Sequence, residues 1–97
     1  MQINLKGKNI IVTGASRGIG AATAAHLAKS GFHIAVHFNS NAKAAESVLK
    51  QIEQDGGSAN LLQFDIADRQ ACEQILGEDI ELNGAFYGAV CNAGIAD

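Results

Sequence analysis

The sequence predicts an α/β fold, in which a βαβαβαβ chain forms a doubly wound parallel sheet. Two observations indicate this fold. Four short apolar runs alternate with three helical patterns, and a glycine-rich turn joins the first run to the first helix. Right-handed crossovers between successive strands give the strand order 3-2-1-4. The 97 residues are expected to form one such unit.

The first half of the chain predicts two strands around one helix. The strands are expected at 9–13 and 33–38, and the helix at 18–30, with Gly31 as its terminating residue. One face of this helix carries small or apolar residues that suit close packing on a sheet: Gly20, Ala24, Leu27 and Ala28.

The second half repeats the pattern. Ser40 or Asn41 can cap a second helix, and Asp55-Gly56-Gly57 ends it. A third strand is expected at 59–64, and Asp68 then begins a short helix. A fourth strand at 85–91 is apolar nearly throughout, which is typical of a parallel strand covered on both faces. The apolar faces of the two helices consist of Ala42, Ala45, Val48, Leu49 and Ile52, and of Ala71, Ile75 and Leu76.

The turn TGASRGIG, from Thr13 to Gly20, carries the strongest functional signal. Gly14 allows a tight exit from the strand, Gly18 lets the backbone approach a pyrophosphate, and Gly20 lets the helix pack close to the sheet. The phosphates would lie at the helix N-terminus, where unpaired N–H groups and the positive end of the helix dipole converge. The turn therefore predicts a Rossmann-type dinucleotide site, although such turns also serve as plain strand–helix connections.

Two later motifs strengthen this interpretation. Asp65 follows the third strand and Asn92-Ala93-Gly94 follows the fourth. With the glycine turn, they resemble the N-terminal half of a short-chain dehydrogenase/reductase over essentially all 97 residues. Within that family, 31–68 and the segment Gly84-Ala85-Phe86-Tyr87-Gly88 are most similar to 3-oxoacyl-[acyl-carrier-protein] reductases. The resemblance implies an NADP-dependent oxidoreductase of fatty-acid or polyketide-type synthesis, which reduces an acyl-carrier-protein-bound 3-oxoacyl thioester to the 3-hydroxyacyl form and assembles as a homotetramer.

The cofactor is predicted from charge. In this fold an acidic residue at the end of the second strand binds the ribose of NAD, whereas a basic residue accommodates the 2′-phosphate of NADP. No Asp or Glu occurs from Ala21 to Ala45, and Phe38 stands where NAD-using relatives tend to carry Asp. Arg17 is placed to reach the phosphate. These features favour NADP(H), although Arg17 could be a solvated turn residue and His37 a strand-end histidine.

The resemblance also implies roles for the later motifs. Asp65 matches the aspartate that binds the adenine amino group, beside the backbone of Ile66, although it could instead stabilise a turn. Asn92-Ala93-Gly94 matches the turn along which the adenosine ribose lies. The expected cofactor-binding residues are Gly14, Ser16, Arg17, Gly18, Ile19, Gly20, His37, Phe38, Asn39, Ser40, Asp65, Ile66, Asn92, Ala93 and Gly94.

No catalytic residue is assigned. The family uses a Tyr acid with a Lys four residues later, but the only tyrosine, Tyr87, is followed there by Cys91. The chain is therefore expected to be the cofactor-binding, N-terminal part of a longer enzyme, and to be neither active nor well packed alone. The alternatives are another short-chain reductase acting on a steroid, sugar or small alcohol, a non-catalytic NADP-sensing module, and an α/β protein without nucleotide.

Composition predicts a cytoplasmic protein without nucleic-acid or membrane partners. The net charge is −3, and no apolar run approaches the roughly 20 residues that span a bilayer. Residues 1–8 have no secretory pattern. Cys72 and Cys91 stand outside any CxxC or Cys/His cluster, so free thiols and no metal site are expected. His26 and His33 are not expected to take part in catalysis.

Overall fold

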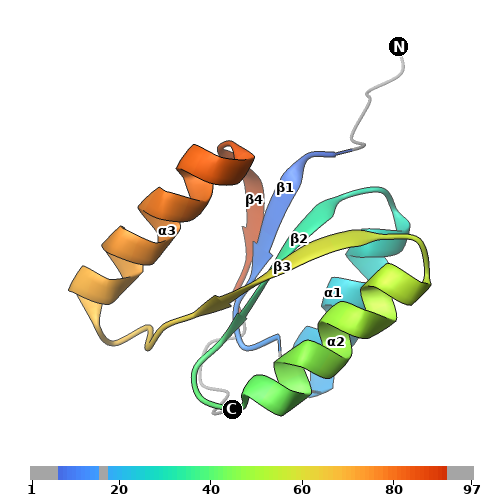
Figure 1. Ribbon diagram of the computed structural model, residues 1–97, viewed down its shortest axis with the longest axis horizontal. Coiled ribbons are helices and arrows are strands. Elements are labelled where there is room, and N and C mark those ends of the chain that lie inside the picture. The colour runs from blue at the N-terminus through green and yellow to red at the C-terminus, as the bar shows by residue number, and fades with distance from the viewer. Residues whose placement is uncertain (1–6, 16–17, 92–97) are drawn as a thin grey trace.

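A computed structural model of the chain describes residues 7–15 and 18–91, and places a four-stranded sheet between two helical layers (Figure 1). The strands are β1 (Asn9–Val12), β2 (His33–Phe38), β3 (Ser58–Gln63) and β4 (Phe86–Val90). Neighbouring strands run parallel in the order β3-β2-β1-β4. The predicted fold class and strand order are therefore confirmed, and the strand ends differ from the prediction by one residue at most.

Three helices connect the strands of the described residues: α1 (Gly18–Lys29), α2 (Ala42–Gln54) and α3 (Arg69–Asn83). The side chain of Asn41 caps α2 by accepting the N–H of Ala44 at 3.1 Å. Asp68 caps α3 in the same way, since its carboxylate accepts the N–H of Ala71 at 3.1 Å. Of the two residues that could cap the second helix, Asn41 does so.

The expectation that the third helix is short was wrong. With 15 residues, α3 is the longest helix of the described chain. The α3 residues that pack on the core beneath it end at Leu76, but a helix that has been nucleated extends at little cost beyond such contacts. It ends only at Gly84, whose φ of 91° leaves the helical conformation.

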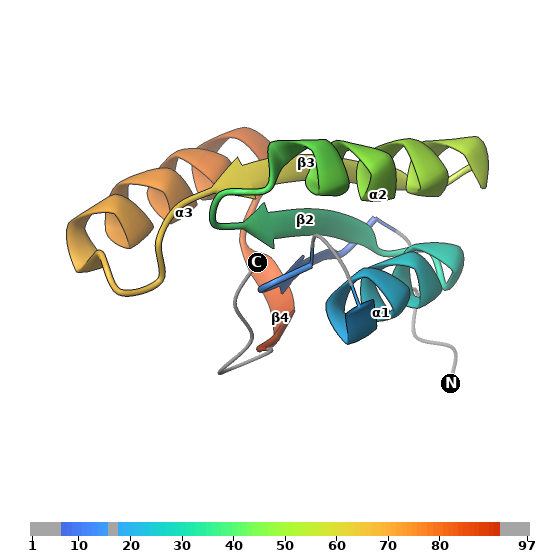
Figure 2. The ribbon, with the colours of Figure 1, turned by 90° about the horizontal axis from the view of Figure 1, so that it is seen from below.

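Alternate side chains of the strands enter two separate cores, one on each face of the sheet. Figures 1 and 2 show α1 and α2 on one face and α3 on the other. Ile10 of β1 and Ile34 of β2 belong to the core beneath α1 and α2, whereas Ile11 and Ala35 belong to the core beneath α3. The sheet is therefore buried on both faces at its centre, as expected of parallel strands.

The apolar pattern of the fourth strand is typical of cover on both faces, but in the described residues the strand has no such cover, in line with the expectation that this chain alone is not well packed. Along β4, half-buried and exposed residues alternate, and Tyr87 is 57% exposed. The strand lies at the edge of the described sheet, so β1 is its single pairing partner there. The Tyr87 ring stacks on Phe32 with centroids 6.1 Å apart, which covers part of it.

A chain of polar side chains joins α3 to the amino end of the strands. The buried carboxylate of Asp79 accepts the side-chain amides of Asn60 and Asn83 at 2.8 and 2.9 Å. The side-chain oxygen of Asn60 lies 2.8 Å from one ring nitrogen of His33, and the Ser58 hydroxyl lies 2.6 Å from the other. These bonds stabilise the end of the sheet opposite the glycine turn.

Candidate cofactor site

The glycine turn begins where β1 ends, at the carboxyl edge of the sheet. Gly14 and Gly18 have φ angles of 60° and 64°, a region that residues with a Cβ rarely occupy. A Cβ built on Gly18 meets no atom of the described chain within 4 Å, so the space beside this backbone is open. Gly20 is buried on the face of α1 that packs on the sheet. The turn thus leaves the N-terminus of α1 approachable from solvent.

Hydrogen bonds fix this turn to the strands on both sides. The N–H of Thr13 donates to the Val90 carbonyl at 2.9 Å, which joins the turn to the end of β4. The N–H of Ala15 donates to the His37 carbonyl at 2.9 Å, which joins it to the end of β2. Thr13 and Ala15 are therefore both tied to neighbouring strands at the start of the turn.

His37 makes two further bonds from its ring. One ring nitrogen, Nδ1, accepts the N–H of Gly14 at 3.1 Å, and the other, Nε2, lies 2.8 Å from the Phe64 carbonyl oxygen. The residue is only 2% exposed. Both ring nitrogens therefore bind protein groups, and a direct contact between this ring and a cofactor stays a prediction.

Three other predicted site residues lie around the end of β2: Phe38 is buried, and Asn39 and Ser40 are exposed. Phe38 is 4% exposed and belongs to the core beneath α1 and α2. Asn39 and Ser40 follow it and are both exposed. The exposed polar residues at this end of β2 are therefore Asn39 and Ser40, and the aromatic ring of Phe38 is part of the core.

Asp65 lies exposed just beyond β3, beside the same edge of the sheet. Its carboxylate accepts the N–H of Ala67 at 2.9 Å, so the turn-stabilising role that the sequence left open is present. The adenine contact stays a prediction. Ile66, 57% exposed, and Ile19 at the start of α1, 72% exposed, add apolar surface beyond the carboxyl ends of β3 and β1.

The remaining predicted site residues lie outside the described part of the chain. These are Ser16 and Arg17 in the glycine turn, and Asn92, Ala93 and Gly94 after β4. Of the described set, the structure brings Gly14 and His37 into direct contact, and the carbonyl that His37 approaches belongs to the residue before Asp65. Sequence reasoning missed Phe64, which contacts His37 through both its carbonyl oxygen and its ring.

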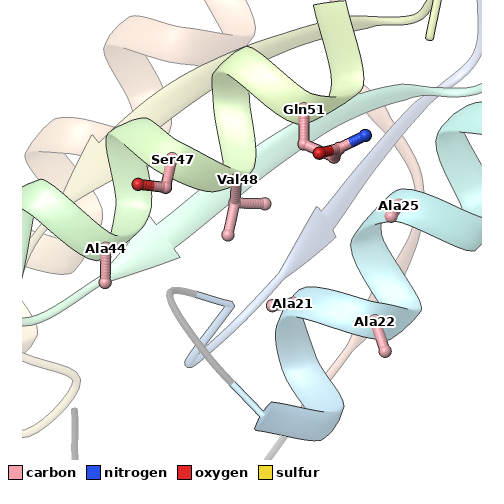
Figure 3. A pocket seen from close by; sticks show the side chains of 7 residues that line it. All are labelled: Ala21, Ala22, Ala25, Ala44, Ser47, Val48 and Gln51. Carbon is pink, nitrogen blue, oxygen red and sulfur yellow. The ribbon is translucent and has the colours of Figure 1, made fainter. Parts of the chain in front are cut away.

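A groove of 460 Å³ lies elsewhere, between α1 and α2 (Figure 3). Ala21 and Ala25 of α1 face Val48 and Gln51 of α2 across it. None of its lining residues is titratable, and it lies on the outer surface of the helices. It therefore offers no chemistry for a reaction.

Other kinds of site find little support among the described residues. They hold no cluster of three His, Cys, Asp or Glu side chains that could bind a metal ion. Both cysteines belong to the described range and are free thiols. In the same part of the chain, no helix combines the length and hydropathy needed to cross a membrane.

Comparisons with known proteins agree with this geometry. The chain is 44% identical over 88 residues to 3-oxoacyl-[acyl-carrier-protein] reductase FabG of Aggregatibacter actinomycetemcomitans, covering 91% of the chain and 36% of that relative. A dehydrogenase/reductase structure from Sinorhizobium meliloti 1021 superimposes with a TM-score of 0.88 at 43% identity, covering 94% of the chain and 36% of that structure. The structure of the angucycline C-6 ketoreductase LanV with bound NADP superimposes with a TM-score of 0.84 at 37% identity, covering 95% of the chain and 38% of that structure.

The chain thus spans about a third of the length of the proteins that it resembles. The model of the short chain dehydrogenase family matches residues 8–97, which include the glycine turn and all four strands. This chain belongs to the short-chain dehydrogenase/reductase family of oxidoreductases.

Proposed function

We propose that this chain binds NADP(H) at the carboxyl edge of its sheet and forms the cofactor-binding part of a 3-oxoacyl-[acyl-carrier-protein] reductase. One observation carries the proposal: the turn around Gly14 and Gly18 leads into an open helix N-terminus. Family membership supports a nicotinamide cofactor, the FabG relative supports an acyl thioester substrate, and the LanV structure supports the phosphorylated form of the cofactor.

The start of α1 suits a pyrophosphate in two ways. Its first turn carries no acidic side chain, so no carboxylate of that turn competes for the N–H groups or opposes the helix dipole. The open space beside Gly18 lets a phosphate approach the backbone closely. Exposed Ile19 and Ile66 offer apolar surface to the flat rings of a dinucleotide.

The preference for NADP(H) rests on the charges near the end of β2. The first acidic residue of the whole sequence is Glu46, so nothing before α2 can bind a ribose diol as a carboxylate does. The exposed residues at this end, Asn39 and Ser40, are uncharged. We assign Arg17 to the 2′-phosphate, Asp65 and Ile66 to the adenine, and the 92–94 turn to the adenosine ribose.

The bound cofactor would supply hydride to the β-keto carbonyl and leave a 3-hydroxyacyl thioester. The residues of this chain would hold and orient the dinucleotide. The 97 residues contain no Tyr-x-x-x-Lys pair to protonate the developing alkoxide, so we expect them to bind NADPH without reducing a ketone. An acyl-carrier-protein partner and a homotetramer belong to the same proposal.

Cofactor choice is tested by adding or removing one charge. Arg17→Ala should remove a charge-assisted hydrogen bond that contributes about 1.5–3 kcal/mol to the binding free energy. The affinity for NADPH should therefore fall about 10- to 100-fold, and the affinity for NADH should stay nearly unchanged. Asn39→Asp places a carboxylate at the exposed end of β2, and should also weaken NADPH by more than it weakens NADH. Dissociation constants measured by nucleotide fluorescence check both.

The matched control is Gln54→Glu, the same amide-to-acid change at the exposed far end of α2. It should leave both affinities unchanged, because solvent and salt screen charges farther apart than about 10 Å. If Arg17→Ala and Asn39→Asp weaken NADPH and NADH equally, the assignment to NADP(H) is wrong.

A different substrate is the main competing proposal, because LanV is a ketoreductase of an angucycline. Turnover of the full-length enzyme with acetoacetyl-acyl carrier protein should far exceed turnover with a polycyclic ketone of the same concentration. If turnover is higher with the polycyclic ketone, the proposed substrate class is wrong and an aromatic ketone takes its place. The cofactor assignment would not be affected.

A further inference from the structure

The His37 ring lies between two turns that the proposed site uses for different parts of the ligand. Its Nδ1 lies 3.1 Å from the N–H nitrogen of Gly14, in the turn assigned to the phosphates. Its Nε2 lies 2.8 Å from the carbonyl oxygen of Phe64, directly before the residue assigned to the adenine. One side chain therefore connects the ends of β1, β2 and β3.

The chemistry of these partners fixes the state of the ring. A peptide N–H can only donate a hydrogen bond, so Nδ1 must carry a lone pair. A carbonyl oxygen can only accept, so Nε2 must carry the proton. Only the neutral Nε2–H tautomer satisfies both bonds, and with 2% of the residue exposed, water is a poor replacement for either partner.

Main-chain bonds reinforce the same connection. The His37 carbonyl accepts the N–H of Ala15 at 2.9 Å, and the Phe38 carbonyl accepts the N–H of Phe64 at 3.2 Å. The His37 ring also packs on the Phe64 ring, with centroids 4.2 Å apart and planes at 41°. The spacing between the phosphate turn and the adenine turn is therefore set by the ring and carbonyl of His37 together with the carbonyl of Phe38.

We propose that His37 is a positioning residue, which holds these two turns at the spacing that a dinucleotide requires and sets its affinity in this way, in place of the direct contact that the sequence predicts. This inference rests on the proposed NADP(H) site. A ligand that bridges two preset halves avoids the cost of ordering them, and small displacements of such groups weaken binding strongly.

Three substitutions separate the two ring bonds from the volume of the ring. Asn places its side-chain oxygen where Nδ1 lies, so His37→Asn keeps an acceptor for Gly14. Gln places its side-chain nitrogen near the position of Nε2, so His37→Gln keeps a donor for Phe64. His37→Phe keeps an aromatic ring and loses both bonds.

His33 provides a matched control at the other end of the same strand. Its two ring nitrogens also have partners, Asn60 and Ser58, but these lie away from the proposed site. His33→Phe thus removes the same kind of side chain and tests whether general loss of stability lowers cofactor affinity.

NADPH dissociation constants and urea unfolding curves should be measured for all five proteins. We expect His37→Phe to weaken NADPH about tenfold or more, His37→Asn and His37→Gln each to recover part of that loss, and His33→Phe to bind like the wild type. Affinity for NADPH should not follow the free energy of unfolding. His37→Asn and His37→Gln fill less of the buried space than His37→Phe and should be less stable, yet they should bind NADPH more tightly. In ¹⁵N-labelled protein, the His37 ring should be neutral and protonated at Nε2.

The outcomes distinguish this inference from the proposed function. If the wild type binds NADPH and all His37 variants bind equally well, or if affinity only follows stability through every variant including His33→Phe, His37 is not a positioning residue. A ring protonated at Nδ1 would overturn the inference as well. If the wild type itself does not bind NADPH, the proposed function fails and this inference fails with it.

Discussion

One added methyl group at Gly57 should destabilise the fold. Gly57 lies between α2 and β3, and a Cβ at this position would be 2.9 Å from Ile52 Cγ2, 3.1 Å from the Ile52 carbonyl oxygen and 3.3 Å from Ala28 Cβ. Neither neighbour has room to withdraw, since Ile52 is 1% exposed and Ala28 is 6% exposed. The Ile52 carbonyl is also held by the N–H of Gly57 at 2.8 Å. We expect Gly57→Ala to lower the free energy of unfolding by about 1–3 kcal/mol, the usual range when an added group overpacks a core.

Gly77 supplies the matched control for the same substitution. It lies exposed within α3, and a Cβ there meets no described atom within 4 Å. Gly77→Ala should stabilise the protein by about 0.5–1 kcal/mol, because alanine loses less backbone entropy in a helix. Urea unfolding followed by circular dichroism measures both changes, provided that the slope of each transition is unchanged. A Gly57→Ala variant as stable as the wild type would refute the close junction of α1, α2 and β3.

Three further substitutions test other parts of the structure. Phe38→Asp removes a buried ring and buries a carboxylate, so it should lower the free energy of unfolding by more than about 4 kcal/mol. Circular dichroism should then show a largely unfolded protein, and a native spectrum would instead place this side chain outside the core. Asp79→Ala leaves the amides of Asn60 and Asn83 without their acceptor and should cost about 1–3 kcal/mol in urea unfolding, with NADPH affinity unchanged; no loss would mean that water replaces the carboxylate. Asn41→Ala removes the cap of α2 and should cost about 1 kcal/mol in the same assay, whereas an unchanged midpoint would show that the cap bond contributes nothing.

The sequence was sufficient for the fold wherever the signal is local. Alternation and helical spacing located all four strands within one residue at either end, and the Asp68 cap was identified from its residue type and place alone. The length of α3 was missed for a physical reason. The final turns bury the polar Asp79 and leave the apolar Ile80 and Leu82 exposed, so they do not continue the apolar face that the first turns pack on the sheet.

The candidate site was predicted less completely, because its internal contacts are distant in sequence. The partners of the His37 ring are 23 and 27 residues away, and no spacing rule connects them. Phe64 contributes its carbonyl, which any residue type would supply, and its ring, whose contact with His37 no spacing rule predicts. For Phe38, however, a usable signal was present: Ile34, Val36 and Phe38 alternate along β2 and belong to one core.

This alternation has a consequence for where cofactor preference can be changed. A carboxylate at Phe38 would have to replace a ring that packs beneath α1 and α2, so its effect on NADPH could not be separated from unfolding. Asn39 follows directly, is exposed, and contributes its main-chain carbonyl to a bond with the Gln63 side chain at 3.1 Å, which Asn39→Asp leaves in place. One residue step along an extended chain covers only about 3.3 Å, so a charge at Asn39 still lies at the end of β2. We therefore expect Asn39→Asp, rather than a change at Phe38, to test electrostatic repulsion of a 2′-phosphate, with urea unfolding as the check that the variant stays folded.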